Sequence, residues 1–227
     1  MTLLETVEEN LTLSKRDKKY LNINKKYKDL CKKIGEQKSN QWIEEVCNIT
    51  LKFQHLLSQR FCLYDTETTS TGNDDEIIEL GILDSRLEFE YNQLFNPNKQ
   101  IAKAAQDVHG ISHDIVKTMP KFSEHRTQIQ EFFDRYELSL AYNGEFDVRL
   151  IKQTCFTHNI DQIKLPALYD PLKDMSLWCG NWNQKYSSFK YLKLEGGHRA
   201  IDDCKQMLKV IDLIASLDVE RLKNEYT

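Results

Sequence analysis

The spacing of apolar positions changes near residue 60 and divides the chain into two regions. From residue 61 onward, short apolar runs typical of strands end in polar or turn-forming residues. We expect strands within FCLYD (61–65), EIIELGILD (76–84), LEFEYNQLFNP (87–97) and LSLAY (138–142), and around ALYDPLKDM (167–175). Helical spacing predicts helices at 102–108, from about Ser112, and at 123–136, 143–156, 187–194 and 199–217. Three strands, then helices, then alternating strands and helices form a mixed α/β pattern.

The first region is rich in lysine and has no strand pattern. Apolar residues from Trp42 to Leu57 recur at helical spacing, and Ser39 could cap that helix. We therefore expect a lysine-rich helical extension at 1–59 and a second domain at 60–227. The extension either braces the second domain or uses its lysines to contact nucleic acid, a polymerase or another protein.

Composition leaves the class of partner open. Hydrophobic residues make up 40% and charged residues 29%, as in ordinary globular proteins, and the formal net charge of −4 neither supports nor excludes nucleic acid. The six cysteines form no CxxC pair, and the sequence has no secretory signal and no apolar run of the ~20 residues that a membrane span needs. We expect a cytoplasmic protein with reduced thiols and no membrane partner.

Two segments place carboxylates beside predicted strand ends. Asp65 and Glu67 come at the end of the first strand, two residues apart, so that both leave the same side of an extended chain. Asp147 lies one turn into the helix after the fourth strand, and Asn143 could cap that helix. Taken singly, each segment has a simpler explanation. Asp65 and Glu67 could belong to a turn whose side chains bond to nearby backbone. Asp147 could be an acid favoured by the helix dipole.

A third segment, EGGHRAIDDC, adds a histidine. On one continuous helix His198 and Asp203 would be separated by roughly 140°. They can face one site only if His198 lies on the lead-in formed by Gly196 and Gly197, with Asp203 on the helix itself. Asp202 is the competing carboxylate, and its simpler role is an exposed acid in the first helical turn.

Together these segments supply four acids and one histidine at strand ends and helix starts, where sites in α/β sheets form. Oxygen ligands in this number suit Mg²⁺ or Mn²⁺ far better than zinc, because neither a thiolate nor a histidine cluster accompanies them.

The motifs D-x-E-T-T, N-x-x-F-D and H-R-A-x-D-D, with VHGIS at 108–112 after the first, resemble those of the DEDDh (DnaQ-like) 3′-to-5′ exonucleases. The proofreading epsilon subunit of bacterial DNA polymerase III is the best-known member of that family. The resemblance covers about residues 60–217 and implies a ribonuclease H-like mixed five-stranded sheet flanked by helices.

The resemblance also implies roles for particular residues. His198 would be the general base, and two divalent ions, Mg²⁺ or Mn²⁺, would be held by the four acids Asp65, Glu67, Asp147 and Asp203. The residues expected near the terminal nucleotide are Thr66 through its backbone, Val108, His109 and Asn143.

Two departures from the family pattern concern substrate fit. The family usually has glycine directly after D-x-E-T-T, whereas Ser70 and Thr71 precede Gly72 here, so the loop is longer. Tyr142 stands where a histidine often precedes the asparagine of the second motif. Neither change touches an expected metal ligand.

The sequence thus predicts a metal-dependent 3′-to-5′ exonuclease that releases nucleoside monophosphates, with single-stranded DNA favoured as substrate and RNA left open. The alternative is a module on an exonuclease fold that binds nucleic-acid ends or a protein. Trp178, Trp182 and Tyr186 either stack on the bases of a single strand or anchor a loop on the core.

Overall fold

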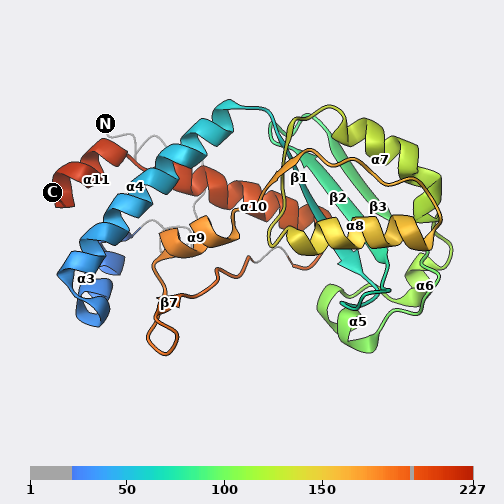
Figure 1. Cartoon of the computed structure of the whole chain (residues 1–227), viewed down its shortest axis with the longest axis horizontal. Coiled ribbons are helices and arrows are strands. Elements are labelled where there is room, and N and C mark those ends of the chain that lie inside the picture. Colours follow the sequence, from blue (N-terminus) through green and yellow to red (C-terminus); the bar gives the residue numbers. More distant parts are fainter. Residues whose placement is uncertain (1–21, 195–196, 227) are drawn as a thin grey trace. The chain divides into compact units, whose positions relative to one another are not determined.

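The structure is a computed structural model that describes residues 22–194 and 197–226 (Figure 1). Its packing divides the chain into two compact units. The sheet unit comprises Arg60–Pro171 and Leu194–Leu208. The helical unit comprises Met1–Gln59 as far as it is described, Leu172–Lys193 and Lys209–Thr227.

The sheet unit is built on a mixed five-stranded sheet (Figure 1). Its strands are β1 (Cys62–Thr68), β2 (Ile77–Asp84), β3 (Glu90–Leu94), β4 (Leu138–Leu140) and β5 (Ala167–Tyr169), in the spatial order β3-β2-β1-β4-β5. β1 pairs antiparallel with β2 and parallel with β4, and β4 pairs parallel with β5. Because β1 and β4 are parallel, their carboxyl ends meet at one edge of the sheet.

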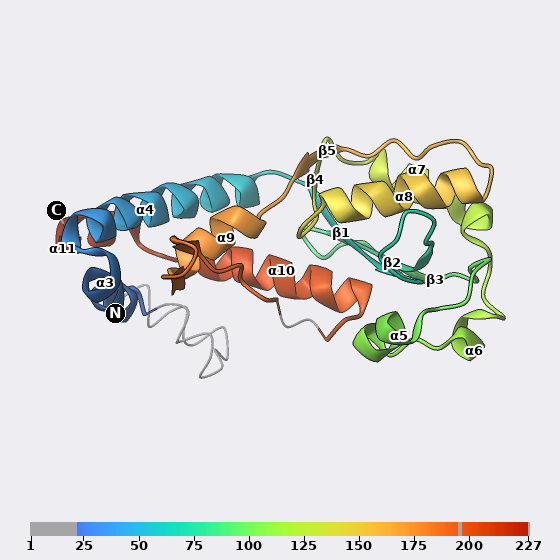
Figure 2. The ribbon, with the colours of Figure 1, turned by 60° about the horizontal axis from the view of Figure 1, so that its bottom comes forward.

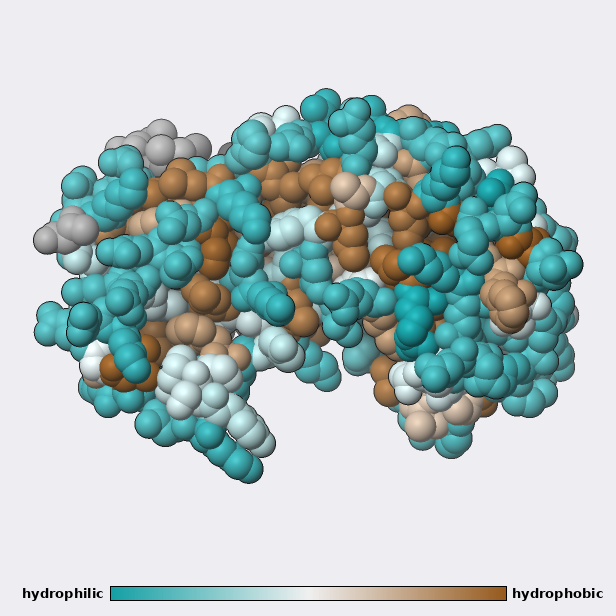
Figure 3. Space-filling model, in the orientation of Figure 1, coloured by the Kyte–Doolittle hydropathy of each residue, from teal (hydrophilic) through white to brown (hydrophobic). Residues whose placement is uncertain are grey.

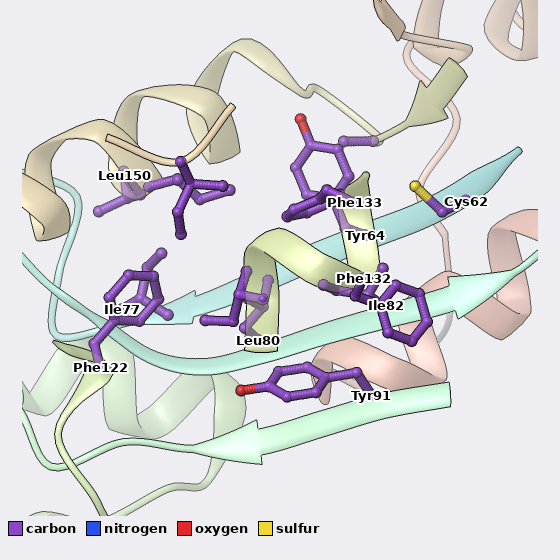
Figure 4. Close-up of a cluster of buried hydrophobic side chains, with 14 of the residues drawn as sticks. Cys62, Tyr64, Ile77, Leu80, Ile82, Tyr91, Phe122, Phe132, Phe133 and Leu150 are labelled. Carbon is purple, nitrogen blue, oxygen red and sulfur yellow. The ribbon is translucent and has the colours of Figure 1, made fainter. Parts of the chain in front are cut away.

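One face of the sheet carries the main apolar core, under α7 (Arg126–Phe133), α8 (Glu145–Thr157) and the short 3-10 helix η1 (Phe122–His125). Figure 2 shows α7 and α8 on the same side of the sheet. Figure 4 shows Phe133 beside Tyr64 of β1, and their rings meet edge to face at 5.5 Å. Each fully buried side chain of this size contributes about 1.5–3 kcal/mol, so the core holds β1 firmly against its helices.

The opposite face of β2 receives the first turns of α10 (Ala200–Ala215). A Cβ atom at Gly81 would lie only 2.6 Å from the backbone nitrogen of Ile201, and the Cys204 sulfur lies 3.8 Å from the Gly81 carbonyl oxygen. Only glycine permits this approach of helix to strand. Two further short helices complete this unit, α5 (Lys103–His109) and α6 (His113–Val116).

The helical unit is organised around one long helix, α4. Its elements are α3 (Ile23–Ile34), α4 (Glu36–Ser58), α9 (Leu172–Cys179), α11 (Val219–Tyr226), the second half of α10, and a two-stranded hairpin of β6 (Trp182–Asn183) and β7 (Ser188–Phe189). Helix α4 packs against α3, α9 and α11. The Trp42 indole N–H donates to the Leu177 carbonyl at 2.7 Å, and that of Trp178 donates to the Thr50 hydroxyl at 3.2 Å.

The expected fold class is confirmed, since the sheet is mixed, five-stranded and flanked by helices. Three local predictions are wrong. Residues 187–194 form no helix but include β7, whereas α9 forms where only the exit of the fifth strand was expected. Ser39 lies inside α4, where its hydroxyl donates to the Gly35 carbonyl, because the helix already begins at Glu36. The division into domains at 1–59 and 60–227 stays a prediction.

Two further observations concern the chain as described. All six cysteines are free. Within residues 22–194 and 197–226, no helix combines the length and the apolar character that crossing a bilayer requires.

Candidate metal-binding active site

The carboxyl end of β1 presents two acids on one face of the sheet. In the pairing with β2, Asp65 lies opposite Gly81 and Glu67 opposite Glu79. The alternation of the strand puts Asp65 and Glu67 on the same face, and both are half-buried. Because Gly81 has no side chain, the space beside Asp65 is open to α10.

Helix α10 brings the third acid. Asp203 lies in its first turn, and one carboxylate oxygen from each of Asp65, Glu67 and Asp203 lies within 4.8 Å of the others. The neighbouring Asp202 is exposed. The structure therefore selects Asp203, and not Asp202, as the acid of α10 that meets those of β1.

Asp147 approaches the site from α8. Its side chain is buried, and the Thr66 hydroxyl donates to its Oδ1 at 2.6 Å. Asp147 is not part of the group of three acids within 4.8 Å, but after burial it is the largest influence that raises the pKa of Asp65. The hydrogen bond from Thr66, the neighbour of Asp65 in β1, holds Asp147 at the same end of the sheet as the other three acids.

Burial, joined at Asp65 and Glu67 by repulsion from the other acids, makes these carboxyl groups hard to ionise. Burial, and then the neighbouring Asp147, raises the pKa of Asp65 well above its usual range. Burial, and then Asp203, raises the pKa of Glu67 to about 8. Burial raises the pKa of Asp147 to about 7 despite the hydrogen bond from Thr66, and burial also raises the pKa of Asp203. A cation would remove this cost, so the donor set fits a divalent metal ion with oxygen ligands.

His198 lies just outside α10. Gly197 and His198 both have positive φ, 85° and 57°, and the helix begins two residues after His198, at Ala200. The half-buried His198 forms a backbone hydrogen bond to Asp203, which lowers the pKa of that acid. Gly197 and the start of the helix thus hold His198 and Asp203 next to each other.

An ion pair that sequence reasoning missed fixes the start of α10. Glu79 of β2 is fully buried, and the Arg199 Nε lies 3.0 Å from both of its carboxylate oxygens. The Ala200 backbone N–H also donates to Glu79, at 3.2 Å. Since a buried carboxylate needs such partners, an acid inside the apolar run EIIELGILD was the signal that could have revealed the pair.

The residues expected near a nucleotide differ in how far their side chains are exposed to solvent. Val108 is exposed, whereas His109 is buried. The Ile111 backbone N–H donates to His109 Nδ1 at 3.0 Å, and His109 Nε2 lies 3.2 Å from the Thr68 carbonyl oxygen, to which it donates. Both ring nitrogens of His109 therefore tie the segment after α5 to the end of β1.

The expectation that Asn143 caps α8 is wrong. The N-cap is Gly144, and no side chain caps the helix. Asn143 instead adopts a φ of 60°, and its backbone N–H donates to Asp170 Oδ1 at 3.1 Å. Asparagine tolerates this left-handed conformation better than most residues.

The fold and the acid cluster define an α/β domain that can hold divalent cations at one end of a mixed sheet. Comparison with known proteins extends this assignment. Residues 62–211 match the model of the exonuclease family (RNase T), and the chain belongs to this family. The resemblance to DEDDh exonucleases is confirmed, and the protein is an exonuclease, that is, a nuclease that hydrolyses phosphodiester bonds.

Two relatives and one solved structure illustrate the similarity. The chain is 29% identical over 167 residues to the "Uncharacterized exonuclease CP81" of Escherichia phage 186, covering 66% of this chain and 86% of that protein. It is 27% identical to DNA polymerase III subunit epsilon of Buchnera aphidicola subsp. Schizaphis graminum, covering 63% of this chain and 67% of the subunit. A zinc-bound crystal structure of the E. coli ExoI-ssDNA complex matches with a TM-score of 0.58 at 16% identity. That match covers 74% of this chain and 42% of the ExoI chain, so this chain spans less than half of that protein.

Proposed function

We propose that this exonuclease is a 3′-to-5′ enzyme that releases nucleoside monophosphates from single-stranded DNA with the help of two divalent metal ions. The observation that carries the proposal is the group of Asp65, Glu67 and Asp203, whose oxygens converge within 4.8 Å. The buried Asp147 accepts a hydrogen bond from Thr66 of the strand that contains Asp65. Such a concentration of carboxylates is costly without cations, and a pure binding module has no need for it.

We assign Asp65, Glu67, Asp147 and Asp203 as the residues that hold Mg²⁺ or Mn²⁺. When bound, two such ions supply an activated water and stabilise the leaving 3′ oxygen. Thr66 contributes by fixing the orientation of Asp147 through its hydroxyl. The ion pair of Glu79 and Arg199 holds Asp203 at its place in the first turn of α10.

His198 is proposed as the general base. A neutral imidazole can accept the proton of the attacking water near neutral pH. The left-handed backbone at Gly197 and His198 places this histidine ahead of the helix and beside Asp203. The substrate contacts are assigned to the Thr66 backbone, Val108 and Asn143, with the exposed Val108 offering an apolar surface to the terminal nucleotide. The buried His109 is assigned to the same region as the residue that holds the segment next to Val108 in place.

The choice of substrate and partners follows the relatives. The ExoI structure with the same fold is a complex with single-stranded DNA, which favours that polymer over RNA. The epsilon relative is named as a subunit of DNA polymerase III, so we propose a polymerase as a protein partner, reached through the extension 1–59. The six free cysteines agree with a cytoplasmic location.

The proposal is tested by a time course with 5′-labelled single-stranded DNA and with matching RNA, in Mg²⁺, in Mn²⁺ and in EDTA. We expect a metal-dependent ladder that shortens from the 3′ end and runs faster on DNA. The double variant Asp65→Ala with Asp203→Ala should produce no ladder. Immediate release of the 5′ label as one short product, without labelled intermediates, would overturn the polarity. No cleavage of either polymer with binding intact would favour the binding module.

Replacement of His198 by alanine should lower the exonuclease rate by about 10²–10⁴-fold while metal binding persists. In the wild type, the rate should fall as the pH is lowered, because an imidazolium cannot accept the proton. The residual rate of the variant should lack the contribution of the histidine to that fall and keep only the one caused by protonation of the acids. The measurement is a pH-rate profile of both proteins, with His55→Ala, an exposed histidine of α4, as the matched control. Full activity of the His198 variant would remove the residue from its assigned role.

A further inference from the structure

The hairpin of β6 and β7 in the helical unit exposes aromatic rings that the core does not use. Tyr186 is 67% exposed and Tyr191 is 70% exposed. Trp178, by contrast, is buried at 1% exposure and anchors α9, so it cannot stack on a ligand. Exposed rings contribute little to folding, which leaves Tyr186 and Tyr191 available for binding.

The hairpin has a defined structure that can hold these rings in place. Trp182 of β6 and Phe189 of β7 pair and pack edge to face at 5.2 Å. Ser187 has a φ of 47° in the turn, and the Leu192 backbone N–H donates to the buried Ser176 hydroxyl of α9 at 2.9 Å. The second arm is thus tied to the helical core, and the turn with Tyr186 lies beyond the paired strands.

Lysines alternate with the aromatic residues of the hairpin. Lys185 precedes Tyr186, Lys190 precedes Tyr191, and Lys193 follows, and all three lysines are exposed. The sequence has no acidic residue between 175 and 194. In Figure 3 the hairpin, at the lower left where Figure 1 labels β7, shows mainly pale and teal side chains, those of intermediate and hydrophilic residues.

The two units differ strongly in charge. The sheet unit has thirteen basic and twenty-two acidic residues in its sequence, whereas the described residues of the helical unit have fourteen basic and nine acidic ones. A polyanion is repelled by the unit that contains the acid cluster. Basic residues of the helical unit supply the complementary charge.

We propose that the hairpin of residues 181–193 binds single-stranded nucleic acid, with Tyr186 and Tyr191 stacking on unpaired bases and the three lysines contacting phosphates. Aromatic rings interleaved with lysines bind single strands without strong sequence preference. Paired bases in a duplex offer no free faces, so the surface discriminates against double strands. The inference rests on the proposed function in one respect, namely that the single strand bound by the hairpin is the substrate of the exonuclease.

The first test measures binding in EDTA, so that no hydrolysis occurs, by fluorescence anisotropy with 5′-fluorescein oligodeoxythymidylate, the matching oligouridylate, and a DNA duplex. Tyr186→Ala combined with Tyr191→Ala should weaken binding of both single strands about tenfold or more. Tyr186→Phe with Tyr191→Phe keeps the rings and should retain binding. Phe156→Ala, which removes an 84% exposed ring of α8, should also leave binding unchanged.

The lysines are tested by the salt dependence. The triple variant Lys185→Gln, Lys190→Gln, Lys193→Gln should reduce the slope of log affinity against log salt by up to about 2. Lys152→Gln, an exposed lysine of α8, is the matched control and should not reproduce that reduction. Unchanged single-strand binding in both the tyrosine and lysine variants would overturn the inference and leave the hairpin to a protein partner. Equal losses on duplex and single strand would also overturn the stacking role.

Hydrolysis separates this inference from the proposed function. With an oligonucleotide substrate, the double alanine variant should show a raised KM at an unchanged kcat, whereas its rate on a dinucleotide should equal that of the wild type. If the wild type binds through the hairpin but hydrolyses no strand, the proposed function fails and the inference stands. If the wild type hydrolyses strands and the hairpin variants bind them equally well, only the inference fails.

Discussion

Replacing Asp203 by asparagine should lower exonuclease activity by about a thousandfold, whereas the same change at the adjacent Asp202 should leave it nearly unchanged. One carboxylate oxygen of Asp203 lies within 4.8 Å of one from Asp65 and one from Glu67, whereas Asp202 is exposed. Loss of a single preorganised charge-stabilising group in an active site costs about 10²–10³-fold in rate. Loss of a metal ligand also weakens binding of the metal ion. The two variants differ by one position in sequence and have identical chemistry.

The comparison also separates catalysis from stability. Because burial and nearby acids raise the pKa of Asp203, the amide should remove repulsion, and the metal-free Asp203→Asn protein should melt at a temperature no lower than that of the wild type. The measurements are initial rates on 5′-labelled DNA and thermal unfolding in EDTA. Equal activity of the two asparagine variants would exclude Asp203 from the site, and a large drop in melting temperature would make a structural role the better explanation.

The second large effect should appear in the pH dependence of stability without metal. The pKa of Glu67 is raised to about 8 and that of Asp147 to about 7. An acid whose pKa is higher in the folded state binds its proton more tightly there, so the folded protein is favoured below the pKa of the unfolded chain, near ~4. This advantage is lost as the pH rises from about 4.5 through about 8, and the free energy of unfolding in EDTA should decrease over that window.

Mg²⁺ should reverse the loss. At about pH 8 the ion should raise the melting temperature, and at about pH 5 it should change it little, because Glu67 and Asp147 are then protonated. In a chain of this size each 1 kcal/mol corresponds to about 2–4 °C. Glu67→Gln is the control, because it removes one titrating group and should flatten the pH dependence in EDTA. A Mg²⁺ effect of equal size at both pH values would contradict this account.

The acids of the candidate site could be proposed from the sequence because local spacing constrains part of their geometry. Asp65 and Glu67 share a face through the period of the strand, and Gly197 frees His198 from the helix that contains Asp203. The strands were recognisable because short apolar runs ended in turn residues. These features are local, so local patterns suffice to predict them.

The errors and the missed ion pair concern features decided by contacts with residues outside the segment that was interpreted. The segment SSFKYLKL has helical spacing, but Phe189 pairs with Trp182 across a turn, and that partner cannot be read from the segment alone. The buried pair of Glu79 and Arg199 joins residues 120 positions apart. Asn143 offered a cap, but its left-handed backbone bonds to Asp170 from the end of another strand.

Gly81 gives the site an unusual sensitivity to variation. At a well-packed position an added methyl group usually costs about 1–3 kcal/mol, because neighbouring side chains can adjust in part. At Gly81 a methyl group would meet the backbone of Ala200 and Ile201 at 2.7 and 2.6 Å, and backbone cannot move aside without shifting the start of the helix. Anyone who randomises this chain to alter its specificity should therefore keep position 81 fixed together with the four acids, although it contributes no atom to the chemistry.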